Sequence, residues 1–306
     1  MTALRRPEGG RHARQRSSGG VMREMDAAWQ EWLATNVSRG CTQESMVEAM
    51  VQAGFEMVAA QEIVRRAASA TVAQVAVAAS PADEARAYDY DACPVAAGNT
   101  VRAHDRDVAV RVRFERPQVI AFDDVLSAQE CAELIERARH RLKRSTTVNP
   151  DNGREDVIQL RTSEGFWFQR CEDAFIERLD RRISALMNWP LEHGEGLQIL
   201  HYTQGGEYRP HFDYFPPGQN GSVLHTARGG QRVATLIVYL SDVESGGETV
   251  FPDAGLAVMA RQGGAIYFRY MNGQRQLDPL TLHGGAPVTG GEKWIMTKWM
   301  RERPYV

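Results

Sequence analysis

The sequence predicts an α+β protein in which helices buttress a β-barrel or sandwich, with a small helical domain preceding it. Three observations predict this class. A helical spacing of apolar residues runs from residue 22 to about residue 70, amphipathic helices open the main domain, and short β-rich runs between Gly- and Pro-rich turns follow residue 197. Helices followed by many short strands are typical of such layered folds.

The composition is that of an ordinary globular protein of 306 residues, long enough for one large and one smaller domain. Its net charge of −3 gives no electrostatic reason to expect nucleic acid or a membrane surface as a partner. No apolar run approaches the roughly 20 residues that span a bilayer. Cysteines without C-x-x-C spacing favour reduced thiols in a cytoplasmic protein. They are Cys41, Cys93, Cys131 and Cys171.

The N-terminal part divides into a tail, a helical domain and a linker. Residues 1–20 are basic and rich in Gly and Ser without the apolar centre of a signal peptide, so we interpret them as a disordered basic tail. Residues 21–70 predict three short helices, with a cap at Thr42 and a Gly54-Phe55 break before a last helix through Ile63. Residues 71–106, rich in Ala, predict a linker with room for some helix. The apolar face of the first helix is Met22, Met25, Trp29, Trp32 and Leu33.

The Gly-Phe break in the helical domain weakly resembles the ubiquitin-associated-like modules, although an unrelated small helical bundle is the favoured interpretation. In either case we expect residues 21–70 to recruit a protein partner.

The main domain is predicted to span residues 107–306. It opens with VAVRVRF, where Val108, Val110, Val112 and Phe114 alternate with polar residues as in a half-buried strand. An S-x-x-E capping box places a helix start just after Ser127. A second amphipathic helix covers residues 175–187 and is ended by Pro190. The later strands are LQILHY, ATLIVYL, GAIYFRY and KWIMTKWM.

Two long polar loops interrupt this domain at residues 144–156 and 216–230. Loops of this length inside a compact domain often act as lids, although ordinary connectors fit almost as well.

Three residues of the main domain predict a metal site. His211 and Asp213 are two apart in a strand-like segment, so both can aim at one point. His283 follows an apolar run and precedes two glycines that allow close approach. His201 is the nearest rival, and the other histidines lie in tails, turns or at a helix end. Two histidines and a carboxylate form the facial triad of non-haem Fe(II) oxygenases.

The last predicted strand bears on whether the domain binds an anionic co-substrate. A period of two places Lys293, Ile295, Thr297 and Trp299 on one face of EKWIMTKWM. If that face is interior, the Lys293 ammonium needs an anionic partner, and a dicarboxylate co-substrate would supply one. The alternative pattern, with Lys293 outward and Trp294 inward, stays open.

HYTQGGEYRPHFDYF, GGETVFP and LHGGAPVTGGEKWIMTKWM, in this order, resemble the Fe(II)/2-oxoglutarate dioxygenases of the prolyl 4-hydroxylase branch, over residues 116–303. The resemblance implies a double-stranded β-helix (jelly-roll) core at about residues 195–303. It also implies Fe(II), 2-oxoglutarate and O2 as cofactor and co-substrates, with L-ascorbate rescuing stranded enzyme. The implied activity hydroxylates prolyl residues of a peptide or protein while 2-oxoglutarate yields succinate and CO2.

By motif position, the resemblance implies that His211, Asp213 and His283 bind Fe(II). It implies that the 2-oxoglutarate residues are Lys293, Tyr202, Thr249 and Trp299, with Lys293 and Tyr202 on the C5 carboxylate. Tyr208 and Arg161 resemble residues of the peptide groove, although packing or solvation explains them about equally well. Two alternatives remain at this point. One is an oxygenase of another side chain or a small molecule, and the other is a non-catalytic metal- or peptide-binding barrel.

Overall fold

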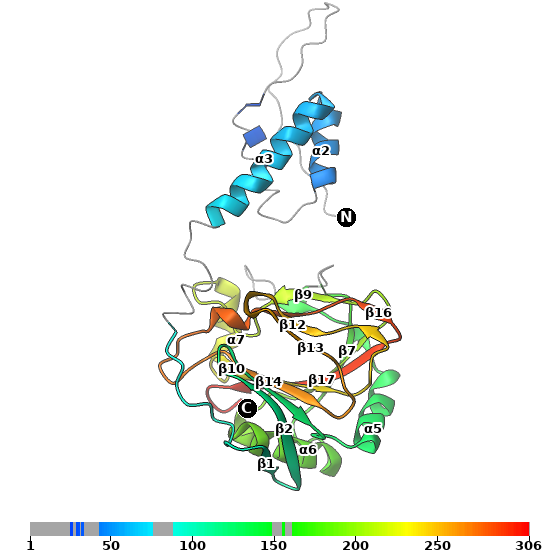
Figure 1. Cartoon of the computed structure of the whole chain (residues 1–306), viewed down its shortest axis with the longest axis vertical. Helices are drawn as coiled ribbons and strands as arrows, with labels where there is room; N and C mark the ends of the chain where they lie inside the picture. The colour runs from blue at the N-terminus through cyan, green and yellow to red at the C-terminus, as the bar shows by residue number, and fades with distance from the viewer. Residues whose placement is uncertain are drawn as a thin grey trace, which may run out of the picture. The chain divides into compact units, whose positions relative to one another are not determined.

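A computed structural model describes residues 25–26, 29–30, 32–33, 43–75, 88–148, 155–156 and 161–305. The chain divides into two compact units, Met1–Ser80 and Pro81–Val306, both drawn in Figure 1. Within the described residues, no helix has both the length and the apolar character needed to cross a membrane.

The first unit packs helices around a small aromatic core. Helices α2 (Gln43–Gln52) and α3 (Met57–Val75) are joined by Gly54 at φ +100, a conformation that glycine adopts without steric cost. Trp29 is buried and packs edge-on against Trp32 and Phe55, at ring-centroid distances of 4.8 and 5.1 Å. Buried Trp29, Trp32 and Leu33 match the predicted apolar face of the first helix. The predicted tail, Met22 and Thr42 lie outside the described residues.

The second unit is built on a nine-stranded antiparallel sheet in the order β1-β2-β3-β14-β10-β17-β8-β7-β4. Both ends of this order are free, so the sheet does not close on itself. Its strands are β1 (Thr100–Ala103), β2 (Arg106–Phe114), β3 (Gln118–Asp123), β4 (Lys143–Arg144), β7 (Glu164–Phe168), β8 (Leu197–Tyr202), β10 (Arg232–Tyr239), β14 (Ala265–Arg269) and β17 (Lys293–Arg301).

A second antiparallel sheet has the order β13-β12-β15-β9. Its strands are β9 (Tyr208–His211), β12 (Thr249–Phe251), β13 (Leu256–Val258) and β15 (His283–Gly285). Two short pairs complete the strands: β5 (Thr147–Val148) with β6 (Glu155–Asp156), and β11 (Ser245–Gly246) with β16 (Val288–Gly290). Three short 3-10 turns are η1 (Leu191–His193), η2 (Pro252–Ala254) and η3 (Pro279–Thr281).

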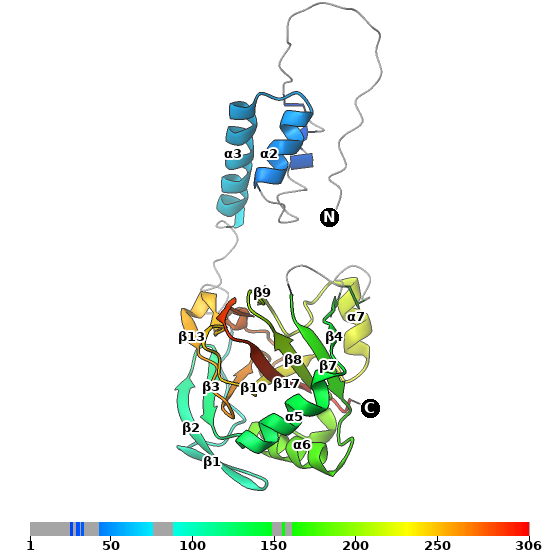
Figure 2. The same cartoon turned by 90° about the vertical axis from the view of Figure 1, so that its right-hand side faces the viewer.

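Two helices cover one face of the large sheet, and the smaller sheet lies toward its other face (Figures 1 and 2). Helix α5 (Ala128–Arg139) starts after Ser127, whose hydroxyl accepts from the Glu130 amide while Glu130 accepts from the Ser127 amide, as the sequence predicts. Helix α6 (Ala174–Met187) is capped by Asp173 and ends in a left-handed Asn188, two residues before Pro190.

Central strands are buried on both faces, because one face packs on α5 and α6 and the other faces the small sheet. In β17, Trp294, Met296 and Met300 join the helix-side core. Lys293, Ile295, Thr297 and Trp299 line the cavity on the opposite side. The period of two therefore holds along β17, with Lys293 on the interior face.

Three segments differ from the sequence-based expectations. The strand predicted at residues 108–114 forms, but its buried alternation stops partway. A register shift in its pairing with β3 lies between Val110 and Val112, and beyond it Val112 is 48% and Phe114 37% exposed. Within residues 71–106, the end of α3 at Val75 fits a linker with some helix, whereas strand β1 at Thr100–Ala103 was not expected. The loop at residues 216–230 contains helix α7 (Asn220–Ala227).

The segment before β2 is expected to be part of the folded unit. A chain that starts at residue 81 should keep the melting temperature of the main unit, whereas one that starts at residue 106 should melt at least about 10 °C lower. The second truncation removes buried Val95, Val101 and Ala103. Burial contributes about 1.5–3 kcal/mol per valine, and 1 kcal/mol shifts a domain of this size by about 2–4 °C. Thermal circular dichroism measures both, and equal melting temperatures would contradict the expectation.

Candidate metal centre and cavity

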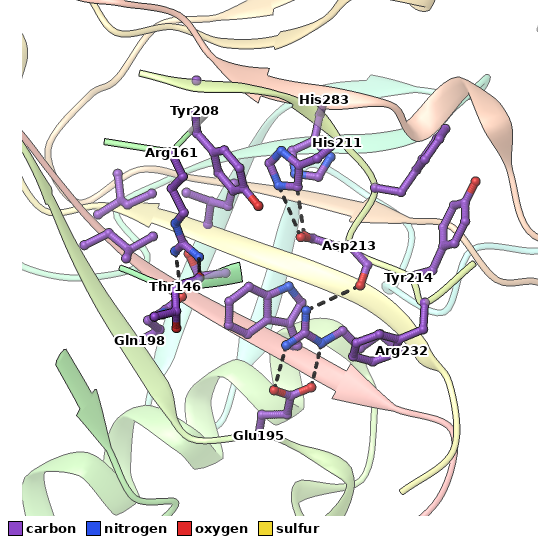
Figure 3. A pocket seen from close by; sticks show the side chains of 18 of the residues that line it. Thr146, Arg161, Glu195, Gln198, Tyr208, His211, Asp213, Tyr214, Arg232 and His283 are labelled. Carbon is purple, nitrogen blue, oxygen red and sulfur yellow. Dashed lines mark hydrogen bonds and ion pairs between the residues drawn. The ribbon is translucent and has the colours of Figure 1, made fainter. Parts of the chain in front are cut away.

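Strand pairing brings two histidines and one aspartate together. His211 ends β9 and His283 begins β15, and the two residues are direct partners in the antiparallel register. Asp213 follows β9, with its Oδ1 3.6 Å from His211 Nε2 and its Oδ2 3.6 Å from His283 Nε2. One donor atom from each side chain lies within 4.8 Å of the others. Figure 3 shows the three side chains converging on one point.

Backbone carbonyls orient both imidazoles. His211 Nδ1 is 2.9 Å from the Arg209 carbonyl and His283 Nδ1 is 3.0 Å from the Thr281 carbonyl. A carbonyl only accepts, so each Nδ1 carries the hydrogen and each Nε2 keeps its lone pair for a metal. Burial lowers the pKa of His283 to about 4, so this imidazole is neutral at pH 7. Neutral imidazoles and a carboxylate are a donor set that fits Fe(II).

The Asp213 carboxylate is held ionised and fixed. Burial raises its pKa, but the opposing influence of His283, His211 and Arg232 is larger and lowers it well below the usual range. The Thr235 hydroxyl, on β10, donates to Asp213 Oδ2 at 2.6 Å. Thr235 is fully buried, so this hydrogen bond has no competition from solvent.

A cavity of about 670 Å³ extends from the three ligand candidates across the interior face of the large sheet. Its lining includes every site residue that the sequence singled out. These are His211, Asp213, His283, Lys293, Tyr202, Thr249, Trp299, Tyr208 and Arg161.

Lys293 is a buried cation without a carboxylate beside it. It is 3% exposed, and among the described residues no carboxylate oxygen lies within 4 Å of its ammonium. The Tyr202 and Tyr239 rings each have their centroid 5.8 Å from Nζ. Burial lowers the pKa of Lys293 to about 8, partly offset by Glu248. An anionic ligand would therefore find a desolvated positive charge here.

Tyr202, Thr249 and Trp299 line different parts of the same cavity. Tyr202 lies directly opposite Lys293 in the pairing of β8 with β17. Thr249 is buried and its Oγ1 accepts from the Tyr239 hydroxyl at 2.8 Å. Trp299 is 7% exposed, and its Nε1 is a buried donor for which the described residues offer no acceptor.

Arg161 and Tyr208 form one side of the cavity. The Arg161 guanidinium donates to the Thr146 carbonyl at 3.0 Å and to Gln198 at 3.3 Å, so it is a buried, anchored cation and not a solvated one. Its Cζ lies 4.9 Å from the centroid of the Tyr208 ring, which in turn stacks on the His211 ring at 3.6 Å.

A second arginine, Arg232, lines the cavity and was not predicted from the sequence. Arg232 forms a two-pronged pair with Glu195 at 2.7 and 2.9 Å and contacts the Asp213 carbonyl at 3.4 Å (Figure 3). Its guanidinium lies 4.0 Å from the Trp299 ring centroid. Arg301 shares the same carboxylate at 2.6 Å. A charged residue at the start of the mostly apolar strand β10 could have indicated Arg232 from the sequence.

His201 and the loop of residues 216–230 lie in different surroundings. His201 is 2.7 Å from a Glu292 oxygen and stacks on Trp294 at 4.1 Å, so it packs, as expected, away from the metal candidates. Helix α7 contributes Ser222 and His225 to the cavity lining.

Comparisons with known proteins show which proteins this chain is similar to. Residues 197–301 match the family model described as the 2OG-Fe(II) oxygenase superfamily. Probable prolyl 4-hydroxylase 3 of Arabidopsis thaliana is 41% identical over 208 residues, covering 62% of this chain and 71% of the relative. Prolyl 4-hydroxylase 5 of the same plant is 40% identical over 209 residues, covering 62% and 70%. The 2OG complex of viral collagen prolyl hydroxylase from Paramecium bursaria Chlorella virus-1 is 29% identical, with a TM-score of 0.47, over 60% of this chain and 95% of that chain.

Replacing Thr235 by Val is expected to weaken binding of a divalent metal about tenfold, the lower end of the roughly 10–100-fold range for partners of metal ligands. The change removes the hydroxyl that orients Asp213 Oδ2. Titration with Co(II), followed by its visible absorption, measures the affinity. Thr297→Val is the control, because this buried hydroxyl on β17 has no hydrogen bond within the described residues. Equal affinities in both variants would contradict the role of Thr235.

Proposed function

The chain belongs to the 2OG-Fe(II) oxygenase superfamily and, within it, to the prolyl 4-hydroxylase family, and from that premise we propose that it hydroxylates prolyl residues of a peptide or protein. It is a 2-oxoglutarate-dependent dioxygenase that uses Fe(II), 2-oxoglutarate and O2. One observation carries the proposal: a single cavity joins a His-Asp-His cluster, an unpaired buried ammonium and a wall of arginine and aromatic side chains.

Each group of cavity residues has its own task in this proposal. His211 Nε2, His283 Nε2 and the Asp213 carboxylate hold Fe(II). The Lys293 ammonium binds the C5 carboxylate of 2-oxoglutarate, and Tyr202 donates a hydrogen bond to the same carboxylate. Thr249 and Trp299 complete the pocket, where the free Trp299 Nε1–H supplies a further donor.

The part of the cavity lined by Arg161, Arg232 and Tyr208 suits a proline-rich peptide. Such a peptide favours the polyproline II conformation, whose carbonyls have no internal hydrogen bonds and whose prolines have no N–H. A groove for it therefore needs donors and aromatic surfaces. Guanidinium groups carry such N–H donors, and Arg161 and Arg232 both line the cavity. Tyr208 supplies an aromatic face beside His211.

The chemistry divides between the metal and the chain. Fe(II), when bound, supplies the activation of O2 that is coupled to decarboxylation of 2-oxoglutarate to succinate and CO2. The chain keeps both histidines in the Nε2-free tautomer, holds Asp213 ionised and anchors the co-substrate at Lys293. Apolar side chains such as Ile237 and Ile295 line the cavity and exclude water.

Several further features complete the proposal. The nine-stranded sheet and the smaller sheet form the two halves of a double-stranded β-helix (jelly roll), and the protein acts in the cytoplasm. L-Ascorbate restores enzyme that has turned over without substrate. The N-terminal helical unit recruits a protein partner. The tightly packed aromatic core of that unit supports independent folding.

Incubation with Fe(II), 2-oxoglutarate, ascorbate and a proline-rich peptide is expected to yield succinate and a peptide heavier by one oxygen on proline. His283→Ala should abolish both products, because it removes one of three ligands. Succinate without any peptide oxidation would leave a 2-oxoglutarate oxygenase but overturn the prolyl substrate. Oxidation located on another side chain by tandem mass spectrometry would assign that residue as the target.

The affinity for 2-oxoglutarate is expected to fall as pH rises through about 8, by up to about tenfold per pH unit. Co-substrate binding favours the charged ammonium of Lys293, which is lost above its depressed pKa. Protein stability has the opposite sign, because the penalty for burying the charged lysine disappears between pH 8 and its ordinary pKa of 10.5. Calorimetric titration of the Mn(II)-loaded protein measures the affinity. Lys293→Met should bind 2-oxoglutarate weakly at every pH, and an unchanged pH profile in this variant would contradict the assignment.

A further inference from the structure

The segment of residues 88–93, which precedes β1, is fastened to the loop of residues 270–278 that leads to His283. The Arg269 guanidinium donates to Asp91 at 2.5 Å and to the Ala92 carbonyl at 3.1 Å. The Asn272 side-chain amide donates to the Asp89 backbone carbonyl at 2.8 Å. The Gly273 backbone amide donates to the Asp91 carboxylate at 2.8 Å. We call residues 88–93 the strap.

One bond of the strap reaches a fully buried carboxylate. The Tyr90 hydroxyl donates to Asp278 Oδ2 at 2.8 Å, and Asp278 has no exposed surface. The other oxygen of Asp278 caps η3 by accepting from the Leu280 amide at 3.0 Å. Tyr90 therefore orients the residue on which η3 begins.

Turn η3 connects Asp278 to the metal candidate His283. The Thr281 hydroxyl and amide both donate to the Asp278 carbonyl, at 2.6 and 3.2 Å. The Thr281 carbonyl accepts from His283 Nδ1 at 3.0 Å, the bond that sets the tautomer and ring direction of this histidine. Hydrogen bonds thus run without interruption from Tyr90 through Asp278 and Thr281 to His283.

The same loop also reaches Asp213. The Asp278 amide donates to the Tyr270 carbonyl at 2.8 Å. The Tyr270 hydroxyl lies 3.3 Å from Thr235 Oγ1, which donates to Asp213 Oδ2 at 2.6 Å. Two of the three metal candidates are therefore oriented by groups that converge on Asp278.

We propose that Tyr90 is a positioning residue for the metal centre, acting through Asp278 and η3 on His283. The strap is then part of the catalytic unit, although it precedes the motifs of the oxygenase core by about a hundred residues. The inference rests on the proposed metal site but not on the identity of the substrate.

Tyr88 provides a matched control within the strap. It is buried, its ring packs edge-on against Tyr90 at 4.6 Å, and its hydroxyl has no hydrogen-bond partner among the described residues. Tyr88→Phe and Tyr90→Phe each remove one hydroxyl from two rings in contact, of which Tyr88 is buried and Tyr90 partly buried. Only the second change breaks the path to His283.

Co(II) titration of the full-length chain tests the inference without turnover. Tyr90→Phe is expected to weaken Co(II) binding by about three- to tenfold, below the effect of a direct ligand partner, and to shift the visible ligand-field bands. Tyr88→Phe should match wild type in both. Asp278→Asn keeps the side-chain oxygen that accepts from the Leu280 amide, and it should weaken Co(II) binding in the same direction as Tyr90→Phe. The double variant should lose less Co(II) affinity than the sum of the two single losses.

Melting temperatures of the metal-free proteins separate positioning from stability. A folded Tyr90→Phe protein with wild-type Co(II) affinity and bands would overturn the inference, even if it melts at a lower temperature. An equal loss of affinity in Tyr88→Phe would overturn it as well. Wild type that binds no Co(II) would overturn the metal site itself, a result distinct from any difference between the variants.

Discussion

The site depends on the pairing of β9 with β15 in one register. This pairing sets His211 opposite His283, although the two residues are far apart in the chain. Residues directly opposite in antiparallel strands have neighbouring side chains on the same face. A shift by one residue would turn one imidazole to the other face of the sheet and dismantle the cluster. Asp213 then needs only to follow β9 closely for its two oxygens to approach both rings.

The buried charges near this pairing differ in whether an opposite charge lies beside them. Although burial raises the pKa of Glu195, Arg232 and Arg301 lower it below its usual range, so that one carboxylate serves two guanidinium groups. Lys298, fully buried on the helix side, has Asp180 at 2.6 Å and also donates to the Glu195 carbonyl. Among the described residues, no carboxylate oxygen lies within 4 Å of the Lys293 ammonium. Burial of this charge is unfavourable by itself, and an anionic ligand in the cavity would offset the penalty.

Sequence patterns predicted the parts that depend on near neighbours. The capping box of α5 joins residues three apart, and the alternation in β17 needs no partner strand to be recognised. The H-x-D spacing and the later histidine were enough to predict the metal cluster. Arg232 was missed because its partner Glu195 lies 37 residues away, and the strap was predicted as a linker because Tyr90 bonds to a residue 188 positions later. The bulge in β2 depends on its pairing with β3, which no local pattern encodes.

The two-sided burial of β17 also bears on how the chain finds its fold. A slip by one residue moves every side chain of a strand to the opposite face. In β17 a slip by one residue would drive Lys293 among the side chains of α5 and α6 and push Trp294 into the cavity. Each misaligned state is then penalised twice, by a desolvated charge and by an indole in the wrong space. Lys293, which begins β17, therefore also favours a single register of this central strand.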